Sequence, residues 1–341
     1  MKKILRQYLL LFIFIICIIT VFTCTTIGVA DISIKQTINI LFQRFIGNKS
    51  IEGIKDSTIA IIWILRFPRV ILAFLVGGAL AICGVAYQGI FKNPMADPFI
   101  IGVSSGAALG ATIGIVLNFS FNFFGINMVT ILAFLGALLT IFLVYNISKV
   151  GNKVPTTTLL LSGVAISQLL LSLVSLFMVF SSSLQKIVYW TMGSMNGKSW
   201  NHIILVLPYV LIGFIILYTV NREMDIMLLG EDTAAQLGVD TEKLKLKILI
   251  ITALLIASTV SVTGIIGFVG LIIPHIVRLL VGPKHKRLIP YSFIIGGIFL
   301  IVCDTIARSM ISQEVPIGII TSIFGGPFFI YLLKRRKNGG A

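Results

Sequence analysis

Long runs of apolar residues, separated by short polar breaks, dominate the sequence. Crossing a hydrocarbon layer ~30 Å thick takes roughly 20 apolar helical residues. Ten runs come close to that length: 8–29, 59–91, 99–117, 128–147, 158–180, 202–220, 246–262, 265–281, 288–308 and 317–333. The pattern predicts an all-α polytopic membrane protein with about ten transmembrane helices, forming a single domain over residues 1–341.

Proline and glycine mark two of the breaks. Pro94 and Pro98 separate the second run from the third. The chain must turn there, because proline has no N–H group and restricts the residue before it. The apolar stretch 248–273 is too long for one crossing, and Gly264 and Pro274 predict a sharp reversal followed by an irregular helix.

Glycines recur at every fourth position after the proline turn. They are Gly102, Gly106, Gly110 and Gly114. A ridge without side chains lets a second helix approach closely, which is a common way to hold helices together in lipid. We therefore predict that these glycines form a helix-packing face.

Composition supports a membrane protein, and the basic residues indicate its orientation. The chain is 57% hydrophobic and 11% charged, whereas soluble domains carry about 25% charged residues. The net charge of +15 is spread between apolar runs, which is typical of membrane topology and not of a nucleic-acid-binding surface. With the N-terminus inside, two thirds of the lysines and arginines fall on the cytoplasmic side, so both termini are predicted to be cytoplasmic.

Cysteine and histidine give no sign of a disulfide or a metal site. Cys17, Cys24, Cys83 and Cys303 all lie inside apolar runs, where packing is the expected role. The chain has no CxxC pair, and its three histidines are far apart in the sequence. We expect no metal ion and no cofactor bound by this chain.

Several long motifs resemble one family of transport proteins. They are RFPR, GGALAICGVAYQ, NPMADP and GVSSGAALGA in the first half, then GEDTAAQLGV, GFVGLIIPHIVR, DTIAR and EVPIGIITSIFGGPFFIYLL. These motifs are similar to those of the FecCD-type permeases of ABC importers, which carry iron-siderophores, haem or cobalamin. The resemblance covers nearly the whole chain and implies a type II ABC importer permease fold.

The resemblance also implies partners. Family members work as dimers of identical or related permease chains, with cytoplasmic ABC ATPase subunits and an extracytoplasmic substrate-binding protein. This chain itself is not expected to be an enzyme. Gly197-Lys198-Ser199 ends like a phosphate-binding loop, but the required glycine five residues earlier is Met192. ATP and magnesium are therefore expected on the partner ATPase.

Three arginines stand at predicted outer helix ends: Arg66, Arg69 and Arg308. Guanidinium groups suit pairing with carboxylates of a soluble partner, but anchoring at the membrane interface explains the positions equally well. The resemblance favours binding-protein docking, the role of arginines at such positions in the family. Asp304 lies four residues before Arg308 and could orient it.

The segment 228–244 is the one substantial polar stretch predicted inside the cell. It reads as two short helices, the first starting near Glu231 and the second capped by Asp240 or Thr241 after Gly238. In the family the matching segment is the coupling helix seated on the ATPase. The resemblance implies ATPase contacts at Gly230, Glu231, Ala235, Leu237 and Gly238.

Pro155, Thr156 and Thr157 precede the fifth apolar run. A helix start with threonine caps explains them on physical grounds. The matching position in the family forms the cytoplasmic gate, and both interpretations can hold together. The family also lines its central path with the fifth and tenth helices, here residues 161–180 and 318–328.

The sequence thus predicts the permease subunit of an importer for an iron(III)-siderophore or related iron chelate, with haem or cobalamin as alternative cargoes. An ion-coupled secondary transporter is the competing class. Such transporters place acidic residues or charge pairs near the membrane midplane, whereas the central parts of these runs are nearly free of acids.

Overall fold

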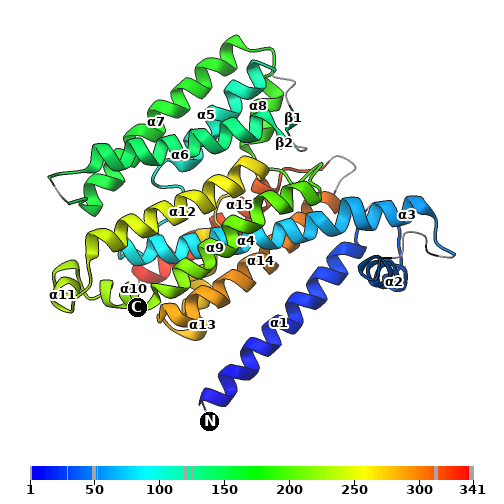
Figure 1. Ribbon diagram of the computed structural model, residues 1–341, viewed down its shortest axis with the longest axis horizontal. Helices are drawn as coiled ribbons and strands as arrows, with labels where there is room; N and C mark the ends of the chain where they lie inside the picture. The colour runs from blue at the N-terminus through cyan, green and yellow to red at the C-terminus, as the bar shows by residue number, and fades with distance from the viewer. Residues whose placement is uncertain are drawn as a thin grey trace.

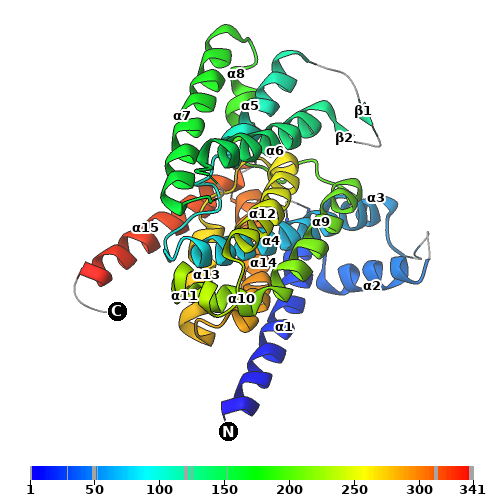
Figure 2. The same cartoon turned by 60° about the vertical axis from the view of Figure 1, so that its left-hand side comes forward.

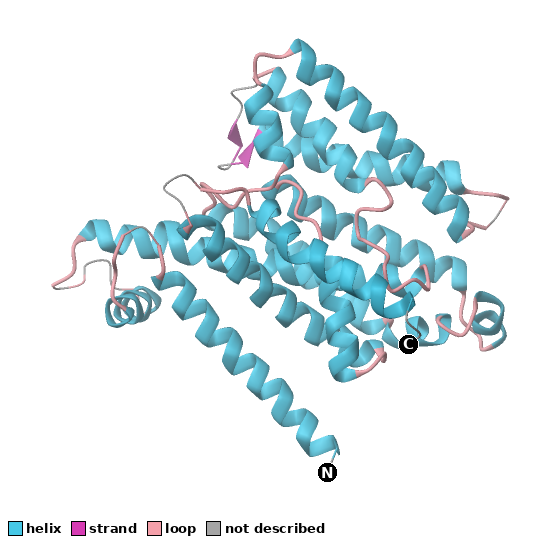
Figure 3. Ribbon diagram, turned by 180° about the vertical axis from the view of Figure 1, so that it is seen from behind, coloured by secondary structure: helices cyan, strands magenta, loops and turns pink. Residues whose placement is uncertain are grey.

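The computed structural model describes residues 2–28, 30–47, 51, 53–118, 122–123, 126–151, 153–310 and 314–337. Helices make up almost all of this part of the chain, and Figure 3 shows one short strand pair beside them. The helices are α1 (Lys2–Thr26), α2 (Ile34–Phe45), α3 (Asp56–Ala60), the π-helix η1 (Ile61–Arg66), α4 (Phe67–Ile90), α5 (Val103–Val116), α6 (Met128–Ser148), α7 (Thr156–Phe180), α8 (Leu184–Thr191), α9 (Trp200–Thr219), α10 (Asn221–Met227), α11 (Glu231–Gln236), α12 (Thr241–Thr263), α13 (Val269–Val281), α14 (His285–Ser309) and α15 (Ile317–Lys337). Strands β1 (Asn122–Phe123) and β2 (Ile126–Asn127) pair antiparallel.

Each of the ten predicted apolar runs contains a helix, so the prediction of an all-α polytopic protein is confirmed. Within the described residues, seven helical segments are long and apolar enough to cross a membrane. Shorter apolar helices fill the other three runs, at α5, α13 and the residues Ile317–Leu332 of α15. The protein is therefore an integral, multi-pass membrane protein.

Helix α4 lies at the centre of the bundle (Figure 1). It continues α3 and η1, and 89% of the apolar window in this 35-residue segment is buried. Helices α14, α13, α9 and α12 surround it. Gly77 of α4 and Gly296 of α14 face each other so closely that a methyl group on Gly77 would overlap the Gly296 carbonyl oxygen. Small residues thus bring the two helices into backbone contact.

Helices α5, α6, α7 and α8 form a second layer beside this central group (Figures 1 and 2). Gly106 and Gly110 lie against the backbone of α6, where a methyl group would overlap the carbonyl oxygens of Gly136 and Leu132. Gly114 is less crowded, because a methyl group there would lie 3.0 Å from the Val129 Cα atom. Gly102 instead faces α7 from a left-handed position (φ 83°) that favours glycine.

The predicted reversal after the seventh apolar run is confirmed. Helix α12 ends at Thr263, and Gly264 follows with φ 73°. Phe268 also has a positive φ of 69° before α13 begins at Val269. Pro274 then lies inside α13. The turn between Thr263 and Val269 takes up part of the apolar stretch. Helix α13 is therefore too short to cross the whole membrane.

The π-helical turn η1 precedes α4, and we attribute it to Pro68. The Phe67 N–H donates to the Ile62 carbonyl, one residue farther back than in an α-helix. In the same pattern, residue 68 would donate to the Trp63 carbonyl, but this residue is Pro68, which has no N–H. The Trp63 carbonyl is therefore left for another group, and the indole Nε1–H of Trp200 donates to it at 2.9 Å.

Helix α2 was not predicted, because it is too short and too polar to resemble a membrane span. Ser33 forms a capping box with Gln36 at its start. One face buries Ile40 and Leu41, while Phe42 and Phe45 are exposed. In Figure 1 the helix is seen nearly end-on beside the long helices, so it runs across them. An amphipathic helix in this orientation suits the membrane surface.

The two ends of the bundle differ in what they carry. The start of α1, helices α10 and α11 and the end of α15 lie toward one end, and α2, α3, α8 and the strand pair toward the other (Figures 1 and 2). The distribution of lysine and arginine makes the first end cytoplasmic. We call the opposite end the outer end.

Candidate functional sites at the two ends of the bundle

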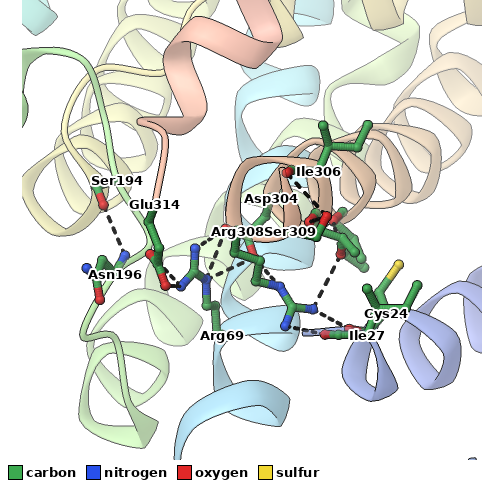
Figure 4. A network of polar contacts seen from close by, with 12 residues as sticks. Cys24, Ile27, Arg69, Ser194, Asn196, Asp304, Ile306, Arg308, Ser309 and Glu314 are labelled. Atoms are coloured by element: carbon green, nitrogen blue, oxygen red, sulfur yellow. Dashed lines mark hydrogen bonds and ion pairs between the residues drawn. The ribbon is translucent and has the colours of Figure 1, made fainter. Parts of the chain in front are cut away.

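Arg69 connects three elements at the outer end (Figure 4). Its Nε and Nη2 atoms donate to the Asp304 carboxylate of α14, at 2.8–3.0 Å. Its Nη1 atom donates to both Glu314 carboxylate oxygens at 2.9 Å. The planar guanidinium fork is suited to two carboxylates at once. Arg69 therefore joins α4, α14 and the residues just ahead of α15.

Arg66 and Arg308 lie beside Arg69 and hold the end of α1. Arg308 donates to the carbonyls of Ile27, at 2.7 Å, and Cys24. Arg66 donates to the carbonyls of Thr26 and Ala30. A helix end leaves such carbonyls without intrahelical donors, and its dipole favours nearby cations. Together with Asp304 and Glu314, these three arginines form what we call the outer arginine cluster.

The three arginines of the outer cluster are buried in the single chain. Docking to a soluble partner relies on accessible guanidinium groups, yet Arg66 is 7%, Arg69 9% and Arg308 6% exposed. Their guanidinium groups bind carboxylates and backbone carbonyls of this chain. The expected Asp304–Arg308 pair exists at 3.7 Å, but Asp304 pairs more closely with Arg69. A docking role stays a prediction.

The cytoplasmic segment folds partly as the sequence predicts: α11 is short, but the helix after Gly238 continues as the long α12 and is not a second short helix. Helix α11 begins at Glu231, and Asp240 caps α12 by accepting from the Lys243 N–H at 3.1 Å. Ala235, Leu237 and Gly238 are exposed, and Leu237 is 59% accessible. Gly230 precedes α11 with φ 127°. The segment thus presents apolar groups outward, as a surface for a protein partner would.

Glu231 differs from its neighbours because it turns inward to Lys245 of α12. The Lys245 Nζ atom lies 3.1 Å from Glu231 Oε2 and 2.5 Å from Glu242 Oε1. It also donates to the Val154 carbonyl at 3.0 Å, while the Val154 N–H donates to Glu242 Oε2 at 2.9 Å. We call Lys245, Glu231, Glu242 and Val154 the lysine clamp. No sequence pattern indicated it, because its members come from three separate segments.

The expected gate residues follow the clamp directly. Pro155 is the N-cap residue of α7, with φ −62°, Thr156 is half-buried and Thr157 is exposed. Helix α7 is the least covered long span, with 11% of its apolar window buried. Leu161, at 72% exposed, is one of its accessible leucines. Such an apolar face needs lipid or another protein chain to cover it.

Helix α15 also leaves apolar side chains uncovered. Ile323 is 60% and Ile330 67% exposed. Its first turns border a recess of about 550 Å³, which Gly318 and Ser322 share with Met192 and Ile265. The two helices expected to line a central path therefore have faces that the rest of the single chain does not cover.

These features define a class: a helical membrane subunit with exposed apolar faces and a protruding cytoplasmic segment suited to a partner. The FecCD transport family matches residues 15–335, and the chain belongs to this family. It is therefore a permease subunit of an ABC importer, which excludes the secondary-transporter alternative and places it in the cytoplasmic membrane.

Curated relatives and a solved structure agree with this assignment. The cobalamin import system permease protein BtuC of Halobacterium salinarum is 45% identical, over 84% of this chain and 76% of its own length. The hemin transport system permease protein HmuU of Yersinia pestis is 36% identical, over 81% and 84%. A solved metal-chelate type ABC transporter in an inward-facing conformation has a TM-score of 0.84 and 31% identity, covering 96% of this chain and 99% of that one.

Proposed function

We propose that this permease carries an iron(III) chelate of the siderophore class into the cell. The observation that carries the proposal is the likeness to the metal-chelate type transporter, which extends over 96% of this chain. The hemin relative also transports an iron chelate. A chelated metal is bulky, and a path between two permease subunits offers more room than a path through one bundle.

Cobalamin import is the second candidate. It is favoured by the Halobacterium relative, which shares more identity with this chain than the hemin permease does. Both candidates are large organic ligands holding a metal ion, so one transport path suits either. Selectivity between them would rest largely on the substrate-binding protein.

The partner contacts belong to the same proposal. We assign ATP and magnesium to the ATPase subunit, the exposed residues Ala235, Leu237 and Gly238 to its contact with this chain, and residues 155–157 to the cytoplasmic gate. This chain would pair with a second copy or a related permease through the uncovered faces of α7 and α15. The apolar exposure of those faces supports the pairing.

We place docking of the substrate-binding protein at Arg69. Its internal partner Glu314 is the more exposed of the two acids, with 31% of its side chain accessible against 1% for Asp304. An acidic residue of the binding protein would take the place of Glu314. We therefore expect Glu314→Gln, which removes the internal competitor, to tighten binding of that protein several-fold. Weaker or unchanged binding would argue against docking at Arg69.

Uptake into proteoliposomes tests the cargo. The chain is reconstituted with its ATPase subunit and binding protein, and accumulation of radioiron-labelled ferric siderophore is compared with that of radiolabelled cobalamin. We expect ATP-dependent uptake of the siderophore. Uptake of cobalamin alone would establish the second candidate, whereas uptake driven by an ion gradient without the ATPase would overturn both.

Variants in the same assay test the ATPase contact. Leu237→Glu places a charge at the exposed C-cap of α11 and should abolish uptake while leaving the fold intact. Lys286→Glu, at an exposed cytoplasmic position on α14, serves as the control. Equal uptake by the two variants would argue against a contact at Leu237.

A further inference from the structure

Lys245 is an unusual residue for its position. It is 2% exposed at the cytoplasmic end of α12, in a chain whose other lysines there lie at the surface, such as Lys243 and Lys247. An ammonium group has three N–H donors. Here they have three oxygen partners, from Glu231, Glu242 and the Val154 carbonyl. A buried cation with every donor used fixes the relative positions of the groups around it.

The clamp holds Val154 by both of its backbone polar groups. The carbonyl accepts from Lys245, and the N–H donates to Glu242. Val154 itself is 3% exposed. The next residue is Pro155, whose φ of −62° is fixed by its ring, and α7 starts at Thr156. The start of α7, where the gate residues lie, is therefore tied to α12 through one residue.

The clamp holds α11 by its first residue. Glu231 follows Gly230, and its carboxylate reaches Lys245 at 3.1 Å. Ala234, one turn later, is fully buried. Glu231 and Val154 are 77 positions apart in sequence (231 − 154), yet both contact the same nitrogen atom. The surface assigned to the ATPase and the start of α7 therefore share one charged group.

We propose that Lys245 is the positioning residue that transmits movement of α11 to the cytoplasmic gate. A shift of α11 moves the Glu231 carboxylate, and Lys245 must then follow it or lose one of its three partners. Either response changes the support of the Val154 backbone and hence the position of Pro155. This inference rests on the proposed function, because it takes α11 as the ATPase contact and residues 155–157 as the gate.

Gate accessibility measures the effect without reference to cargo. The permease is reconstituted with its ATPase subunit, and Thr157→Cys is labelled with a membrane-impermeant maleimide from the cytoplasmic side, with and without a non-hydrolysable ATP analogue. The four native cysteines are buried and give a low background. Lys286→Cys, exposed on α14, reports labelling unrelated to the gate.

We expect the ATP analogue to change the labelling rate at Thr157→Cys at least fivefold in the otherwise native chain. Glu231→Gln keeps a hydrogen-bond acceptor but loses the charge, and it should reduce this change to less than twofold. Asp232→Asn is the matched control. Asp232 is the next residue of α11, it is exposed, and its carboxylate carries the same charge but is not part of the clamp. This control should leave the change intact.

Lys245 is tested in the same way. Lys245→Met should abolish the change in labelling while the partner still hydrolyses ATP within about twofold of the native rate, and Lys245→Arg should restore part of it. Lys247→Met, an exposed position on the same helix, is the control. Should Lys245→Met fail to assemble, Glu231→Gln decides the question by itself, since it leaves Lys245 and Glu242 in place.

The outcomes separate this inference from the function on which it rests. A native-like labelling change in both Glu231→Gln and Lys245→Met would overturn the role of the clamp and leave the gate in place. An otherwise native chain that shows no change at Thr157→Cys would overturn the gate assignment, and with it this inference. Neither result depends on which chelate is transported.

Discussion

The outer arginine cluster and the lysine clamp are both buried ionic groups, at opposite ends of one bundle. The outer cluster has three arginines for two acids and completes its contacts with backbone carbonyls at the end of α1. The clamp has one lysine for two acids and holds a single backbone residue. The first connects long membrane helices to one another, and the second connects short surface segments to one helix.

This difference indicates different roles for buried charge. Removing one partner of a buried pair leaves the other charge without compensation, so the outer cluster should mainly govern the stability of the bundle. Both acids of the clamp are about one third exposed, 35% for Glu231 and 30% for Glu242, so water can replace part of what is lost, whereas Asp304 of the outer cluster is 1% exposed. We expect changes there to affect coupling more than folding.

The largest effect is expected from Asp304→Asn. Asp304 is 1% exposed and faces both Arg69 and Arg308. Loss of its charge leaves two buried cations with Glu314 alone, which should cost about 3–5 kcal/mol of stability. Thermal unfolding in detergent measures this, with exposed Asp232→Asn as the control. An unchanged unfolding temperature would contradict a stabilising role for the cluster.

Arg308→Gln should have a smaller and more local effect. It leaves the carbonyls of Cys24 and Ile27 without their donors, at about 1–3 kcal/mol for buried groups that lose their partners. Hydrogen exchange should rise in the last turn of α1 and stay unchanged in α12. Exposed Arg222→Gln provides the comparison. A uniform increase across both helices would show that the arginine does not act on α1 specifically.

A large loss of stability in Glu242→Gln would contradict the difference between the outer arginine cluster and the lysine clamp. The amide oxygen can still accept from the Val154 N–H, and Lys245 keeps Glu231 as a partner. We therefore expect a loss of about 0.5–1.5 kcal/mol in the same thermal unfolding experiment. A loss as large as that of Asp304→Asn would mean that the two buried groups serve the same purpose.

Asp97 provides a comparison through pH at a site outside both buried ionic groups. It lies in the turn between α4 and α5, and desolvation raises the pKa of its carboxyl from 3.8 to about 6, although the Phe99 N–H hydrogen bond opposes the shift. A raised pKa means that the folded protein favours the protonated form. Its stabilising contribution should be complete below about pH 4 and be lost as the pH rises through about 6. Asp97→Asn should flatten the unfolding temperature over that range, and an unaltered pH dependence would exclude Asp97 as its source.

Much of the fold could be predicted because apolar length and helix breakers are local signals. Pro94, Pro98 and Gly264 each mark a turn that the structure contains. Helix-end preferences alone predicted the start of α11 near Glu231 and a cap at Asp240 or Thr241, of which the structure uses Asp240. Helix α2 was missed because a twelve-residue amphipathic helix at the membrane surface lacks the apolar length that marks a membrane span.

The sites were harder to predict because their partners are distant in sequence. Docking to a soluble protein and anchoring at the interface were both considered for Arg69, and neither indicated its closest partner, Asp304, which lies 235 positions away. The nearer pair of Asp304 and Arg308 was predicted from spacing and proves to be the longer contact. Likewise, Glu231 was expected to contact the ATPase, and its contact with Lys245 within the chain was not predicted. Local spacing shows which charges a segment carries, and only the packed helices show which of them meet.

Chain length can vary by one residue at the π-helical turn before Pro68. Deletion of Ile64 or Leu65 would let the segment return to an α-helix with little rotation of the helix on either side, because a π-turn is one extra residue accommodated in a helix. The Phe67 N–H would still reach the Ile62 carbonyl, and the Trp63 carbonyl would still face Pro68 and stay available to the Trp200 indole. An alignment of natural variants should therefore include chains that are one residue shorter at this turn.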